Sequence, residues 1–259
     1  MPPRPAEPGG AGGPVSEGPE HPGHPGRQPS WLGCGCGLLV ALVLAGFVAM
    51  TWFAYLQGED FKRGLQDPAY RDARTRAVLH YRDLPPGYYP MGAFSVSFFL
   101  KMAMLTDLDP AQGGVSREHP FRQRGFLYLS SHRLGERDRD VRRYLTGEGG
   151  RPDWMERANV DLKEGELLRR GRIETRGIPL LYSASRGEMN VQGQPVRGIA
   201  TLFFVDCPSH ERTRLGLWFG PDPHPGEPAA ADDVTGSPAD PQALAEFAGH
   251  FRFCISEDA

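Results

Sequence analysis

One uninterrupted apolar stretch constrains this chain more than any other feature of its sequence. No charged residue occurs between Arg27 and Glu59, and the run from Trp31 to Leu56 exceeds the about 20 apolar residues that a helix needs to cross a bilayer. A buried core helix would carry polar residues on one face, and this run has no such face. We therefore predict a transmembrane helix over residues 31–57. Its characteristic residues are Trp31, Leu38, Leu39, Leu42, Leu44, Phe47 and Trp52.

The ends of this stretch fit a membrane interface. Trp31 lies at one end and Trp52 and Tyr55 at the other, where amphipathic rings favour the headgroup region. The run is longer than the apolar core of a cleaved signal peptide. Cys34 and Cys36 lie among glycines at the membrane edge, where small residues pack well and where acylation is the alternative reading.

The residues before the apolar stretch form a low-complexity tail. Residues 1–30 contain nine Pro and seven Gly with almost no apolar side chains. Such a segment cannot bury enough surface to offset its ordering entropy, so we expect it to be disordered.

The residues after the stretch, 58–259, are enough for one globular domain. A domain of this size buries roughly 70% of the surface that its unfolded chain exposes, so it needs neither a metal nor disulfides to fold. The chain has a net charge of −3, which argues against a nucleic-acid partner because those proteins carry strongly basic domains.

The first half of the domain predicts helices at either side of two strands. Asp67-Pro68 has the residues of a helix start, and the helix is expected to stop before Leu84-Pro85. Alternating apolar residues predict one strand over 93–104, followed by a strand over 125–131 and a short helix over 138–145.

The second half predicts a run of strands. A hairpin is expected over 166–174 and 177–185, then strands over 195–206 and 213–219. A long Pro-rich loop covers 221–239, and Asp240-Pro241 starts a helix that ends at Gly249. Phe251, Phe253 and Ile255 alternate, which predicts a terminal strand.

These elements predict an α+β fold: one transmembrane helix, then an antiparallel meander sheet packed with a few helices. The element order resembles the PsbP/Mog1-like sandwich, in which a terminal helix leads into a final segment such as Phe247-Ala-Gly-His-Phe-Arg-Phe253. That resemblance implies a binding or assembly role more often than catalysis, although a fold does not fix a function.

Two arguments about the side of the membrane conflict. Lys62, Arg63, Arg71, Arg74 and Arg76 follow the apolar stretch, which favours a cytoplasmic domain, yet long domains translocate largely regardless of charge. The domain holds two cysteines, Cys207 and Cys254, and an even number of cysteines is compatible with one disulfide. The alternative is that they are two unrelated buried thiols.

The tail, the Gly-Cys-Gly-Cys-Gly edge and the Ala/Leu/Val run together resemble the signal anchors of uncharacterised single-pass proteins of high-GC bacteria. The domains of such proteins usually face outward. This resemblance implies a bacterial inner-membrane protein with a periplasmic domain.

No catalytic, cofactor or metal motif rises above background in the sequence, so we assign no such residue and expect no cofactor. The histidines lack metal-ligand spacing, and Cys207 with His210 only loosely suggests an activated thiol. Arg186-Gly-Glu188 and Asp206-Cys-Pro208, expected at opposite ends of adjacent strands, are the first places to look for converging polar groups.

Three functional hypotheses follow. The leading one is a non-enzymatic, membrane-anchored binding or assembly module on the outer face, with a protein or apolar ligand as partner. The alternatives are an adaptor facing the cytoplasm and a membrane-tethered hydrolase that uses carboxylates or Cys207. An apolar surface patch would favour the first of these.

Overall fold

The computed structural model describes residues 63–64, 66–96, 99–109, 121–132, 135–152, 161–191, 194–208, 212–225 and 234–255. The predicted tail and transmembrane helix, with Trp31, Phe47 and Trp52, lie outside these ranges. Within them, no helix is both long and apolar enough to cross a membrane. Residues from Trp52 onward belong to one compact unit, which is the unit described below.

The domain is built on one antiparallel sheet. Its elements are α2 (Pro68–Leu79), β1 (Tyr89–Val96), β2 (Leu100–Thr106), β3 (Gly125–His132), α3 (Glu136–Thr146), β4 (Asp161–Thr175), β5 (Ile178–Val191), β6 (Gln194–Val205), β7 (Arg212–Gly220) and α5 (Pro241–Gly249). Among the described residues, seven strands pair in the order β1-β2-β3-β7-β6-β5-β4. The predicted α+β class with an antiparallel meander is confirmed.

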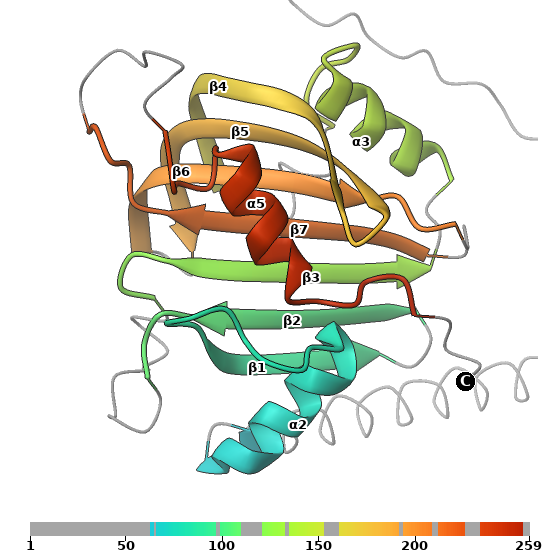
Figure 1. The fold of residues 1–259 in the computed structure, drawn as a ribbon, viewed down its shortest axis with the longest axis vertical. Helices are drawn as coiled ribbons and strands as arrows, with labels where there is room; N and C mark the ends of the chain where they lie inside the picture. The colour runs from blue at the N-terminus through green and yellow to red at the C-terminus, as the bar shows by residue number, and fades with distance from the viewer. Residues whose placement is uncertain are drawn as a thin grey trace, which may run out of the picture. The chain divides into compact units, whose positions relative to one another are not determined.

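The sheet consists of two meanders joined at its centre. β1-β2-β3 and β4-β5-β6-β7 each pair with their sequence neighbours, and β3 pairs with β7 to close the seam between them. Figure 1 shows α5 lying across the sheet, α2 beside β1 at the lower edge and α3 near β4. The α3 segment therefore carries the chain from the centre of the sheet to its far edge.

Local capping explains where two of the helices begin. Asp67 Oδ1 accepts hydrogen bonds from the backbone N–H groups of Ala69 (3.0 Å) and Tyr70 (3.1 Å), and Pro68 occupies the first turn. Asp240 Oδ1 accepts from the Gln242 N–H (2.9 Å) at the start of α5. Both Asp-Pro helix starts are confirmed, since each satisfies backbone donors that the first turn leaves without partners.

The strand expected over 93–104 is wrong: this segment is a hairpin of β1 and β2. Phe94 faces Met102 across the ladder, and Val96 faces Leu100. Side chains that oppose each other across an antiparallel ladder lie on the same face. The even-numbered apolar residues therefore lie on one face both before and after the turn of the hairpin. An alternation of apolar residues cannot distinguish one long strand from two short ones of this kind.

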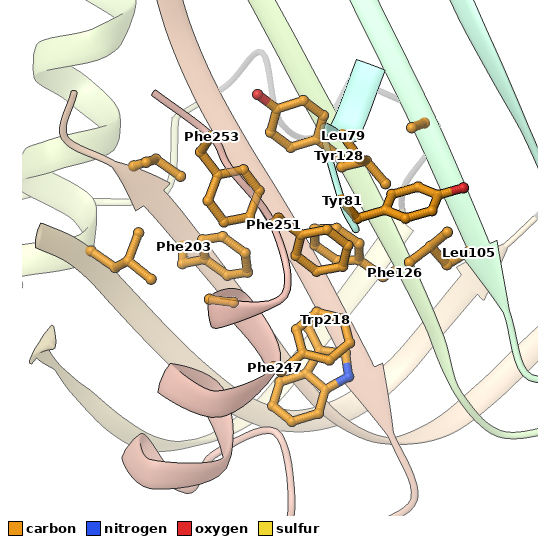
Figure 2. Close-up of a cluster of buried hydrophobic side chains, with 14 of the residues drawn as sticks. Leu79, Tyr81, Leu105, Phe126, Tyr128, Phe203, Trp218, Phe247, Phe251 and Phe253 are labelled. Carbon is orange, nitrogen blue, oxygen red and sulfur yellow. The ribbon is translucent and has the colours of Figure 1, made fainter. Parts of the chain in front are cut away.

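The terminal strand expected at Phe251–Ile255 is also wrong. The described C-terminal segment makes one isolated bridge, between Tyr81 and Phe251, and then turns. Phe251 and Phe253 alternate because both rings are buried in the core beneath α5. Figure 2 shows Phe251 beside Phe126, and Phe253 between Phe203 and Tyr128.

Aromatic rings fill the core between the sheet and α5. Trp218 stacks on Phe247 with ring centroids 4.4 Å apart, and its Nε1–H donates to Tyr88 Oη at 2.7 Å. Phe247 and Phe251 also contact Phe126 at centroid distances of 5.1 and 5.3 Å. These contacts connect α5 and the C-terminal segment to β3 and β7, so the segment covers the seam between the two meanders (Figure 2).

Gly216 makes room for one of these rings. A Cβ at position 216 would lie 2.1 Å from the Phe203 ring, and Phe203 is fully buried and cannot swing aside. A side chain at this position of β7 would therefore push the core apart.

We expect Gly216→Ala to lower the free energy of unfolding by about 1–3 kcal/mol because it overpacks the core. Gly92→Ala in β1 is the matched control, since a Cβ there meets nothing within 4 Å and the change should stay within about 0.5 kcal/mol. Urea unfolding of the full chain in detergent measures both. Equal effects at the two positions would contradict the proposed crowding.

A second prediction concerns Tyr128, whose side chain lies between β3 and the C-terminal segment. Burial raises the pKa of Tyr128 from 10.0 to about 12, and the nearby Arg214 and Ser130 lower it only in part. Between these values the unfolded chain releases the phenolic proton more readily than the folded one. The contribution of Tyr128 to stability is thus complete below pH 10 and is lost as the pH rises towards 12.

Urea unfolding at a series of pH values from 9 to 12 tests this. Tyr128→Phe should make the alkaline fall in stability shallower by about 1.4 kcal/mol per pH unit, one proton's worth. An unchanged slope would show that Tyr128 ionises equally in both states.

Candidate functional site

A wide cleft among the described residues lies at one end of β5 and β6. It has a volume of about 730 Å³ and is lined by Arg186-Gly187-Glu188 of β5 and Arg197-Gly198 of β6. Arg122 and Asp222 contribute to its walls. Arg186 and Glu188 are residues that the sequence singled out, and the structure places both in this cleft.

Arg186 is held in place by carboxylates on two other segments. Its guanidinium contacts Asp222 through Nε and through Nη2, the latter at 3.1 Å from Oδ1, and Nη1 donates to Glu166 Oε2 at 3.3 Å. Nη2 also lies 3.4 Å from the backbone carbonyl of His224. Since the Asp222 side chain is only 8% exposed, this ion pair fixes the 221–225 segment against β5.

The remaining charges of the cleft have mixed signs. Arg197 pairs with Glu188 at 3.2 Å, and the Arg197 side chain is 87% exposed. The backbone N–H groups of Arg122, Gln123 and Arg124 donate to the Asp107 carboxylate, which fixes this wall. The cleft therefore suits a polar or ionic group held loosely. Each described carboxylate in it faces an arginine, which leaves none arranged as a general base.

The second singled-out segment, Asp206-Cys-Pro208, lies at the opposite end of the sheet. Arg142 of α3 donates to both Asp206 oxygens, at 2.8 and 3.1 Å, and its guanidinium lies 4.2 Å from the Phe204 ring centroid. Asp206 thus attaches α3 to the end of β6. The sequence correctly predicted two polar clusters at opposite ends of adjacent strands, and the structure does not bring them together.

Cys207 and Cys254 form a disulfide in the structure, with their Cα atoms 5.4 Å apart. It joins the end of β6 to the residue after Phe253, which is itself buried against Tyr128 and Phe203. In this bond Cys207 is not a thiolate, so it is not available as a nucleophile.

Other acidic and histidine side chains lie within hydrogen-bonding distance of groups elsewhere in the domain. The buried Asp138 accepts a hydrogen bond from the Thr213 hydroxyl, and His250 Nδ1 lies 3.1 Å from the Asp83 carbonyl. In the described part of the chain, no group of three or more His, Cys, Asp or Glu residues is arranged to hold a metal ion. His210, which the sequence analysis paired with Cys207, lies outside that part.

The second surface of interest is apolar and lies on the β1–β2 hairpin. Among the large apolar side chains that are described as exposed, Phe94 (36%), Phe99 (57%) and Met102 (39%) all belong to this hairpin, and only Leu167 lies elsewhere. Val96 and Leu100, both half-buried, complete one face of it. We call Phe94, Val96, Phe99, Leu100 and Met102 the hairpin surface.

Cations lie beside the hairpin surface. A pocket of about 140 Å³ between α2 and the hairpin is lined by Arg74 and Lys101 together with Phe94, Ser95 and small apolar residues. Sequence reasoning missed this site because strand periodicity assigned Phe94 and Met102 to the core. The sequence does hold a signal for it: no acidic residue lies between Asp83 and Asp107.

Comparisons with protein-family models, curated proteins and solved structures found no match to this chain. The functional argument therefore depends on the residues of this chain alone.

The disulfide allows a direct test of what holds the C-terminal segment in place. The two cysteines are 47 residues apart, for which loop-closure entropy predicts about 4 kcal/mol of stabilisation. We expect Cys207→Ala/Cys254→Ala to lower the free energy of unfolding by about 2–4 kcal/mol, measured by urea unfolding of the full chain in detergent. Cys34→Ser/Cys36→Ser is the control. If both pairs have the same small effect, the disulfide does not stabilise the domain.

Proposed function

We propose that this protein is a membrane-anchored binding or assembly module whose domain lies in the periplasm of a bacterium, outside the inner membrane. The observation that carries the proposal is the Cys207–Cys254 disulfide. Disulfides persist in oxidising compartments and are rare in the cytosol, where thiols are kept reduced. A domain that forms this bond belongs on the outer side of the membrane.

The anchor in this proposal is the apolar stretch over residues 31–57. It has no charge between Arg27 and Glu59, and its length fits the hydrocarbon core of a bilayer. In this orientation the Pro/Gly-rich tail before it lies on the cytoplasmic side.

Binding rather than catalysis is supported by the surroundings of the polar groups. Arg186, Glu188, Asp206 and Asp222 take part in ion pairs that connect strands, loops and helices. A hydrolase based on Cys207 would need a thiolate, and this sulfur is in the disulfide. The hairpin surface is instead the kind of exposed apolar patch that marks an interaction site.

The finer fold assignment is part of the same proposal. An antiparallel sheet with a terminal helix that leads into Phe251 and Phe253 resembles the PsbP/Mog1-like sandwich, and that resemblance implies binding or assembly. The competing proposal is an adaptor facing the cytoplasm, which the cations after the anchor favour, Arg63, Arg71, Arg74 and Arg76 among them.

Protease accessibility separates the two orientations. In cells that produce the chain with a C-terminal tag, protease added to intact spheroplasts should remove the tag, because the domain is outside. Lysed spheroplasts provide the control for tag cleavage. Loss of the tag only after lysis would place the domain in the cytoplasm and overturn the proposal.

A thiol assay on the same spheroplasts provides an independent readout. With Cys34→Ser/Cys36→Ser in place, the domain should react with a maleimide only after reduction, since its two remaining cysteines are paired. Equal labelling with and without reduction would show that the disulfide does not form in the cell.

A further inference from the structure

The second half of the edge strand β1 carries none of the sequence features that usually protect a sheet edge, although α2 packs beside the strand (Figure 1). β1 is the first strand in the sheet order, so one side of its backbone is not paired within the sheet. Its first half has Pro90 and a bulge between Pro90 and Gly92, both of which block further pairing. Its second half, Ala93 to Val96, has no charge, no proline and no bulge.

The hairpin surface continues from this unprotected half. Phe94 pairs with Met102 and Val96 pairs with Leu100, so four apolar side chains gather on one face beside the exposed Phe99. The opposite face of the same hairpin carries Ser95 across from Lys101. The hairpin is therefore amphipathic, and its apolar side carries the exposed Phe94 and Met102.

The described charges that line the pocket beside the hairpin are positive. The chain has 32 acidic residues among its 259, yet none lies between Asp83 and Asp107. Arg74 and Lys101 line the pocket beside Phe94, and no described acid lines it. Cations next to apolar and aromatic side chains match an anionic lipid surface, in which phosphates lie directly above acyl chains.

The start of the described chain lies next to this edge. Gly64 lines a small pocket with Met91 and Gly92, and its carbonyl accepts from Arg71 Nη1 at 3.1 Å. The predicted anchor ends at residue 57, so the intervening residues span at most about 25 Å. Phe94 lies two residues beyond Gly92, about 7 Å further along the strand. A membrane that holds the anchor is thus within reach of the hairpin surface.

We propose that the β1 edge docks onto the anionic phospholipid surface of the membrane that holds the anchor, with the hairpin surface on one face of the sheet and the pocket lined by Arg74 and Lys101 on the other. The apolar side chains enter the interface, and the two cations contact lipid phosphates. This inference rests on the proposed anchoring. It adds a defined orientation: the β1 edge faces the bilayer, and the opposite edge at β4 faces away from it.

The test uses the full chain in liposomes, with Cys34→Ser/Cys36→Ser as background. An environment-sensitive fluorophore is attached at Phe99→Cys, and in a second sample at Glu174→Cys on β4 as a control. In vesicles that contain phosphatidylglycerol, we expect roughly threefold weaker quenching by aqueous iodide at position 99 than at position 174. In vesicles of phosphatidylcholine alone, the two positions should differ much less.

A charge variant tests the cations separately. Arg74→Gln/Lys101→Gln should reduce the docked-to-undocked ratio about 25-fold in phosphatidylglycerol vesicles, from a roughly fivefold contribution per cation. Arg172→Gln/Arg176→Gln removes the same charge from the β4 side and should leave this ratio unchanged. Circular dichroism of each variant checks that the fold is retained.

The outcomes separate this inference from the anchoring itself. If alkaline carbonate extracts the chain from the vesicles, the anchor does not span the membrane and the proposed function fails. If the chain resists extraction but position 99 is quenched as strongly as position 174, the docking inference alone is overturned. Protection at position 99 that appears in detergent and disappears on dilution would indicate a second copy of the chain instead, and would also overturn it.

Discussion

The packing of the C-terminal aromatic segment over the centre of the sheet is the interaction on which the rest of this domain depends. Phe247 and Phe251 both contact Phe126 of β3, and Phe247 stacks on Trp218 of β7. β3 and β7 are where the two meanders meet, so the segment covers the one strand pair that no hairpin connects. The disulfide then fixes its far end to β6. The C-terminal segment thus joins the two meanders, whose only other connection in the described sheet is the pairing of β3 with β7.

The parts of this fold that could be predicted from sequence are those with a local cause. Asp67-Pro68 and Asp240-Pro241 start helices because an aspartate oxygen satisfies the N–H groups of the next turn, an effect confined to four residues. The hairpin at Arg176-Gly177 was equally predictable, because a glycine between two strand patterns indicates a tight turn. In the structure both residues adopt the positive φ that such a turn requires. Such features require no knowledge of the distant chain.

The parts that could not be predicted depend on long-range contacts. The pairing of β3 with β7 joins strands that α3 and three strands of the other meander separate in the sequence, and nothing within either strand indicates its partner. The cysteines give the same lesson: the sequence left a disulfide and two separate thiols open, because only the fold brings residues 47 positions apart together. In the candidate site, Arg186 and Glu188 were noticed, but Asp222, which pairs with Arg186 and holds the 221–225 segment, was not.

The two edges of the sheet differ in a way that bears on the proposed orientation. β4 forms one edge and has the sequence DLKEGELLRRGRIET, in which charges of both signs recur along the strand, as expected of an edge that remains in water. β1 forms the other edge and has the sequence YPMGAFSV, without a charge. A sheet surrounded by water on all sides would gain nothing from this asymmetry, since an uncharged edge invites aggregation.

The asymmetry is useful if one edge is always covered, and β1 is the edge that follows most closely after the apolar stretch in the chain. Position in the sequence and chemistry of the strand thus favour the same orientation by independent arguments.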